Sequence, residues 1–244
     1  MQNPFSGVKT YDNYKHLWQL TVSIILLQVV LSTIVALAEK HSGLSFSPFE
    51  AMIPALLATG WVSWTILCSL GVSLNGALSD WGLKAVPDLK KAFVYFSGYA
   101  LVICCLFGAL LGAYYLLGSG LETAMKPLSD QNGAENGLLK VIAEGSRLRS
   151  VLVLFSACVL APVVEEVFFR RIVYVTIRLK KGFWPSAFWS SLLFSLFHGL
   201  AAPVILPVGL YFCWVYERER RLPVNIFLHS LVNLSMIALK VFIA

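Results

Sequence analysis

The sequence has little charge and lacks several common catalytic motifs. Charged side chains make up 13% of its 244 residues, against about 25% in a typical soluble domain. It has no HExxH zinc motif, no GxSxG nucleophile motif, no glycine-rich phosphate loop and no internal repeat. The composition therefore excludes an ordinary soluble domain, and the lack of a repeat counts against a transporter.

Cysteine chemistry is also not indicated. The five cysteines form no CxxC pair, their number is odd, and all lie within apolar runs, at Cys68, Cys104, Cys105, Cys158 and Cys213. We interpret them as small apolar residues and assign them no chemistry.

Apolar residues dominate the amino-acid composition, at 58% of the chain. Several runs reach the roughly 20 residues that cross a bilayer as a helix. A cleaved signal peptide is not expected, because further spans follow the first run. The sequence predicts an all-α, polytopic transmembrane bundle of about seven spans, at 17–38, 51–76, 93–118, 150–177, 183–201, 204–216 and 223–243.

Basic residues predict the orientation. With a cytoplasmic N-terminus, thirteen of the nineteen Lys and Arg lie inside; without Arg170 and Arg171, eleven lie inside and six outside. Topology thus explains the net charge of +6, and no nucleic-acid partner is expected. Residues 119–149 are then external, their second half being either an interfacial helix or a solvated loop. We divide the chain into N-terminal spans with this loop, 1–148, and a C-terminal core, 149–244.

The stretch APVVEEVFFRR places charges inside a predicted span. Glu166 and Arg170, four residues apart, share a helix face and can pair. Glu165 lies about 100° away around the helix, which leaves it free to face a cavity. We interpret Arg171 as an anchor on the cytoplasmic side.

Two later apolar segments carry polar groups one helical turn apart. FSLFH contains Phe194 and His198, and HSLVN contains His229 and Asn233. Ionisable groups inside a membrane are candidate functional groups by default. We therefore expect a catalytic cavity among the C-terminal spans.

These residue types suit hydrolysis of an amide or ester carbonyl. A glutamate in an apolar pocket can act as general base on water, a histidine can hold the water, and a second histidine and an amide can donate to an oxyanion. A zinc site made by Glu165, His198 and His229 uses the same atoms. Helix spacing alone does not favour zinc.

The motifs EEVFFR, FSLFH and HSLVN, in this order, resemble EExxxR, FxxxH and HxxxN. These mark the CAAX-processing and bacteriocin-processing intramembrane proteases, the CPBP or Abi family, which includes the Rce1-type CAAX endopeptidases. The resemblance covers about residues 155–237. It implies that Glu165 is the catalytic glutamate, supported by Glu166, Arg170 and Phe194.

The resemblance further implies that His198 helps Glu165 to activate water, and that His229 and Asn233 bind the oxyanion. We expect an intramembrane endopeptidase, glutamic or metallo-, for a membrane-associated peptide or protein, with no favoured cofactor and zinc as the alternative. A non-catalytic scaffold or bacteriocin self-immunity protein of the same fold is the rival. The expected location is a bacterial or archaeal inner membrane, with the protein spanning the bilayer several times.

Overall fold

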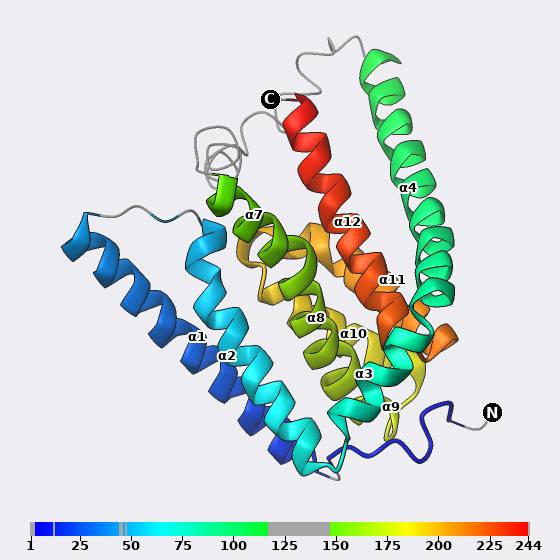
Figure 1. Cartoon of the computed structure of the whole chain (residues 1–244). Helices are drawn as coiled ribbons and strands as arrows, with labels where there is room; N and C mark the ends of the chain where they lie inside the picture. The colour runs from blue at the N-terminus through cyan, green and yellow to red at the C-terminus, as the bar shows by residue number, and fades with distance from the viewer. Residues whose placement is uncertain (1–2, 12, 44–45, 47, 117–146, 244) are drawn as a thin grey trace.

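A computed structural model describes residues 3–11, 13–43, 46, 48–116 and 147–243 (Figure 1). Within these ranges the regular elements are all helical, which confirms the predicted all-α class. Most of the predicted external segment lies outside the described residues. The N-terminal helices are α1 (Tyr14–Ser42), α2 (Pro48–Ser69), α3 (Leu74–Leu83) and α4 (Ala85–Leu116). The C-terminal part comprises α7 (Arg147–Phe155), η1 (Ser156–Leu160), α8 (Ala161–Glu165), η2 (Glu166–Tyr174), α9 (Val175–Arg178), α10 (Phe183–Leu196), η3 (Gly199–Ala201), α11 (Ala202–Glu219) and α12 (Leu222–Ile243).

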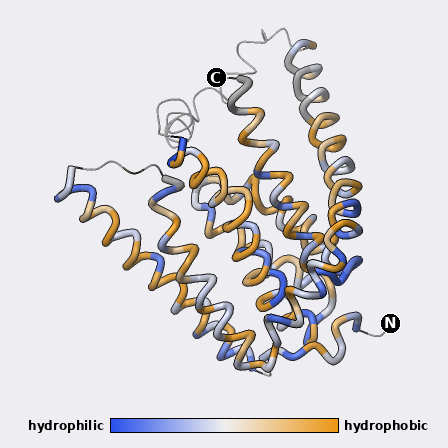
Figure 2. Tube along the Cα trace, viewed as in Figure 1, coloured by the Kyte–Doolittle hydropathy of each residue, from blue (hydrophilic) through white to orange (hydrophobic). Residues whose placement is uncertain are grey.

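Five helical stretches among the described residues are long and apolar enough to cross a membrane. They are Tyr14–Ser42, Glu50–Ser69, Ala85–Leu106, Arg147–Arg178 and Leu222–Leu239. Figure 2 shows long hydrophobic stretches along α1 and α4, and many large apolar side chains of these two helices are exposed. On α1, for example, Leu26 and Val29 are 61% and 58% exposed. Such surfaces suit lipid rather than water, and the chain is a multi-pass membrane protein.

The predicted spans at 183–201 and 204–216 are not among these five, so the count of about seven is not confirmed. They form a helical hairpin. The 14 residues of α10 rise only about 21 Å, less than the roughly 30 Å of hydrocarbon. The chain then turns at Gly199, whose φ of 60° favours glycine, and α11 runs back along α10.

Gly209 sets the close approach of the two hairpin helices. A Cβ at this position would lie 2.9 Å from Cβ of Ser191 and 3.2 Å from Cδ1 of Phe194. Only glycine therefore lets α11 pack this tightly on α10. This contact fixes the position of Phe194, which belongs to the second motif.

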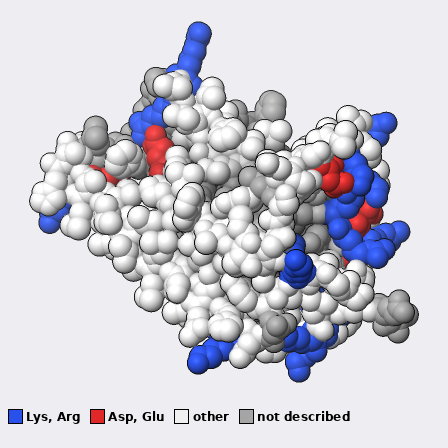
Figure 3. Space-filling view, turned by 60° about the horizontal axis from the view of Figure 1, so that its bottom comes forward, with Lys and Arg blue, Asp and Glu red and all other residues white. Residues whose placement is uncertain are grey.

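The basic residues predicted to share one side of the membrane gather at one end of the bundle. There α1 begins, α2 ends, α4 begins, and the chain passes from α9 to α10 and from α11 to α12 (Figure 1). The hairpin returns to the end from which it started, so this grouping does not depend on whether its two helices cross the membrane. Much of the blue surface in Figure 3 lies around this end. By the bounds of the helices, the basic residues near this end are Lys9, Lys15, Lys84, Lys90, Lys91, Arg178, Lys180, Lys181, Arg218, Arg220 and Arg221. Which end faces the cytoplasm stays a prediction.

Candidate active site

The first motif lies on a long transmembrane helix with two π-helical segments. η1 precedes α8 and η2 follows it, so Glu165 closes α8 and Glu166 opens η2. A π-segment widens the turn and often occurs at functional sites. Here η2 is also the centre of the largest core cluster, where Phe168, Phe169 and Ile172 pack against α1, α2 and α10. The charged motif thus lies within an apolar core.

Glu166 and Arg170 form the buried ion pair that their spacing predicts. Nε of Arg170 lies 3.2 Å from Oε2 of Glu166, and both side chains are 0% exposed. The guanidinium carbon lies 4.6 Å from the ring centre of Phe194 and 5.5 Å from that of Phe212. None of the guanidinium nitrogens makes a well-aligned hydrogen bond. Charge and aromatic contact, rather than hydrogen bonding, stabilise this arginine.

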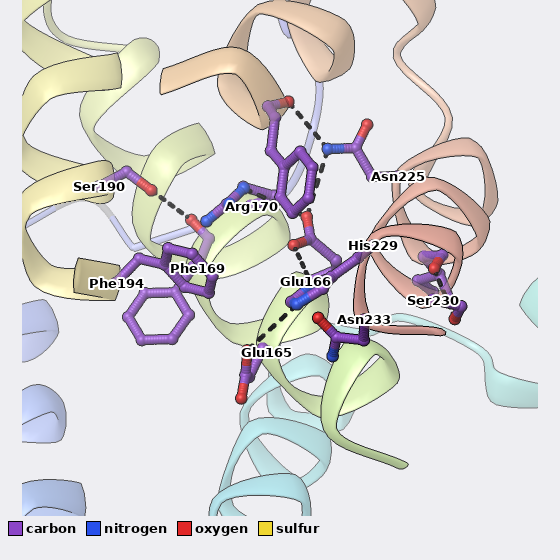
Figure 4. A network of polar contacts seen from close by, with 12 residues as sticks. Glu165, Glu166, Phe169, Arg170, Ser190, Phe194, Asn225, His229, Ser230 and Asn233 are labelled. Atoms are coloured by element: carbon purple, nitrogen blue, oxygen red, sulfur yellow. Dashed lines mark hydrogen bonds and ion pairs between the residues drawn. The ribbon is translucent and has the colours of Figure 1, made fainter. Parts of the chain in front are cut away.

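Glu166 has two further partners, on α12 (Figure 4). Nδ1 of His229 lies 3.0 Å from Oε1 of Glu166, and Nδ2 of Asn225 lies 3.3 Å from Oε2. Nδ2 of Asn225 also donates to the carbonyl oxygen of Phe212, at 2.8 Å. Glu166 therefore joins the first motif to the third. The spacing in the sequence predicted only its pair with Arg170.

Asn225 is a site residue that the sequence analysis missed. It is 0% exposed and precedes His229 by four residues, as His229 precedes Asn233. This repeated spacing of four places all three on one face of α12. The spacing of four residues could have indicated Asn225 from the sequence. Its contact with Glu166 could not be predicted in this way.

Glu165 approaches the other nitrogen of the same imidazole. Oε2 of Glu165 lies 3.7 Å from Nε2 of His229, and the Glu165 side chain is 14% exposed. Glu165 and Glu166 thus lie against different nitrogens of one histidine (Figure 4). The distance is too long for a direct hydrogen bond. It is short enough for a bridging water or substrate atom.

His198 reaches the same region through Phe194. Its Nδ1 lies 2.8 Å from the carbonyl oxygen of Phe194, and the two rings are 4.7 Å apart between centres. The Phe194 ring also contacts His229 edge-on, at 5.8 Å between ring centres. Phe194 is therefore the side chain around which all three motifs meet.

Asn233 contacts the helix of the first motif rather than a glutamate. Its Nδ2 donates to the carbonyl oxygen of Ala157 in η1, at 2.8 Å. The backbone explains why this carbonyl needs a partner. Ala161 N–H bonds to Ser156 in the π-helical register, so the next donor would be Pro162, which has no N–H. Asn233 therefore supplies the hydrogen bond that Pro162 cannot.

The alternative zinc ligands do not form a ready-made metal site. Among the described residues, no three His, Cys, Asp or Glu side chains are grouped so as to hold a metal ion. Glu165 and His229 approach each other, but His198 joins them only through Phe194.

Comparison with known proteins identifies the region that holds the site. Residues 147–235 match the model of a family described as "Type II CAAX prenyl endopeptidase Rce1-like". Residues 147–235 are thus similar to this family. This confirms the resemblance found in the sequence, and the Rce1-like region contains every residue predicted for the site.

One curated relative matches part of the chain. It is the Bacillus subtilis (strain 168) protein named "Putative membrane peptidase YdiL", which is 26% identical over 91 residues. The match covers 36% of this chain and 37% of that protein, so most of each lies outside it. No solved structure matches this chain.

Proposed function

We propose that this chain is an intramembrane endopeptidase that hydrolyses a peptide bond of a membrane-associated substrate with water activated by Glu165. The observation that carries the proposal is the shared imidazole. His229 lies between the buried Glu166, at 3.0 Å, and the partly exposed Glu165, at 3.7 Å. The Rce1-like family match and the peptidase name of the relative support the same class of reaction.

The partners of Glu166 favour one arrangement of hydrogens on His229. Arg170, Asn225 and His229 all approach the Glu166 carboxylate, and an ionised carboxylate only accepts hydrogen bonds. Nδ1 of His229 is therefore the donor, and Nε2 is the nitrogen directed at Glu165. In our proposal Glu166 orients the imidazole, and Glu165 does the proton transfer.

The proposed reaction begins with a water beside Glu165. Glu165 takes one proton from this water as its oxygen bonds to the substrate carbonyl carbon, which gives a tetrahedral oxyanion. Glu165 then gives the proton to the departing nitrogen as the C–N bond breaks. His198 helps to hold the water. His229 begins the reaction as an imidazolium between the two carboxylates, so that Nδ1 donates to Glu166 while Nε2 donates to the oxyanion. The amide of Asn233 has a second hydrogen for the oxyanion, because only one is needed for Ala157.

Peptide profiling of cells tests the proposal. Membrane and secreted peptides are compared between cells with the native protein and cells with Glu165→Gln. Glu39→Gln, the same chemical change outside the predicted site, is the control. We expect substrate fragments to disappear with Glu165→Gln and to persist with Glu39→Gln. If well-folded native protein and Glu165→Gln give the same peptides, the endopeptidase proposal fails and a scaffold role is favoured.

A further inference from the structure

A pocket of about 380 Å³ lies on a different face of the first-motif helix. It is enclosed by α2, α3, α8 with η2, and the turn between α11 and α12, at the end of the bundle that carries most of the basic residues. Its walls are largely apolar and include Trp64, Leu67, Trp81, Val163, Val167 and Leu222. Glu165, His198 and His229 do not line it. The pocket is therefore separate from the proposed active site.

The charges of the pocket are unbalanced. Its lining contains three arginines, Arg171, Arg220 and Arg221, and a single acid, Asp80. Arg221 is already paired, with Asp88 at 2.6 Å and with Asp80 at 3.0 Å. Asp80 also pairs with Lys84, at 2.6 Å. No acid of the lining remains for the other two arginines.

Arg171 is a partly buried cation in this lining. Its Nη2 donates to the carbonyl oxygen of Lys9 at 3.0 Å, whereas its Nη1 is buried without a hydrogen-bond partner. Within the described ranges, Arg171 has no acid at ion-pair distance. A guanidinium that has lost water without gaining an anion is unfavourable. An anion in the pocket would remove this cost.

Arg220 supplies a second cation at the mouth. It is exposed and has no ion pair in the part of the chain that the structure describes. Its backbone ends α11 in the left-handed region, with φ 54° and ψ 23°. Glycine usually occupies this position after a helix. An arginine here places a long cationic side chain at the pocket where a glycine would place none.

We propose that this pocket binds an anionic phospholipid, with its phosphate at Arg171 and Arg220 and its apolar part along the walls. Guanidinium groups match phosphate oxygens in shape and charge. Tryptophans such as Trp64 and Trp81 are typical of the headgroup level of a bilayer. Basic pockets between transmembrane helices are known sites for anionic headgroups. The apolar walls favour a lipid over a soluble anion.

Lipid retention by the purified, full-length protein tests this proposal. Native mass spectrometry and melting curves are recorded in neutral detergent with added phosphatidylglycerol, phosphatidylcholine or inorganic phosphate. We expect phosphatidylglycerol to bind and to raise the melting temperature, and the other two to do neither. Arg220→Gln should weaken phosphatidylglycerol binding about tenfold through the lost charge-assisted contact. Arg220 is exposed, so this variant is expected to fold.

Two variants complete the design. Arg218→Gln removes an exposed arginine that lies over Trp214, outside the pocket, and should bind the lipid normally. Ala77→Phe narrows the pocket without changing its charge and should weaken binding. Equal loss in Arg218→Gln, equal retention of phosphatidylcholine, or equal stabilisation by inorganic phosphate would each overturn the proposal. Displacement of the lipid by a short peptide with a free C-terminal carboxylate would assign the pocket to a peptide instead.

Discussion

Replacing Arg170 by alanine tests the buried ion pair at the centre of the site. Arg170 and Glu166 are both 0% exposed, with 3.2 Å between Nε and Oε2. The substitution leaves an ionised carboxylate in the core with only His229 and Asn225 as partners. Removing one member of a buried pair typically costs about 3–5 kcal/mol. The lost contacts with the rings of Phe194 and Phe212 are included in this free-energy cost and not added to it, because the contributions of residues in contact are not additive.

Melting curves of the purified protein measure this effect. At about 2–4 °C per kcal/mol for a chain of this size, the expected loss is roughly 6–20 °C. Arg170→Lys keeps the charge but loses the planar stacking, and should fall between alanine and native. Glu165→Gln is the matched control. Its side chain is partly exposed and pairs with no arginine in the described part of the chain, so its melting temperature should stay close to native.

A double variant separates charge from packing. Glu166→Gln with Arg170→Met leaves neither charge unpaired, so its destabilisation should be smaller than the sum of the single changes. The reasoning is refuted if Arg170→Ala melts like the native protein, or if Glu165→Gln unfolds while Arg170→Ala does not.

Three further predictions concern topology, metal and the oxyanion. In a background without native cysteines, Arg220→Cys should resist an impermeant thiol reagent added outside and Gln131→Cys should react; the opposite labelling would invert the orientation. Activity should survive extensive chelation, whereas stoichiometric zinc that is lost and restored together with activity would refute the metal-free mechanism. Asn233→Ala should lower the rate about 10²–10³-fold, and Asn233→Asp at least as much, because it sets an anion against an anion. A large fall in melting temperature with an unchanged rate would instead make Asn233 purely structural, through Ala157.

The sequence by itself determined the features that depend on neighbouring residues. The lengths of the apolar runs predict membrane-spanning helices, because each helix must be long and apolar enough to cross the bilayer whatever its neighbours are. The spacing of Glu166 and Arg170 predicts their pair, because residues four apart share a helix face. The order of the three motifs indicated the Rce1-like resemblance, because that order can be read from the sequence alone.

Tertiary structure decided which helices meet and at what depth. The pairing of Glu166 with His229 joins residues 63 positions apart, and no local spacing encodes it. The short hairpin of α10 and α11 depends on the fit of Gly209 against Ser191, which is a contact between helices. Asn233 meets Ala157 because Pro162 leaves a carbonyl free on a different helix. These contacts depend on how helices pack, and packing depends on the shapes of both partners at once.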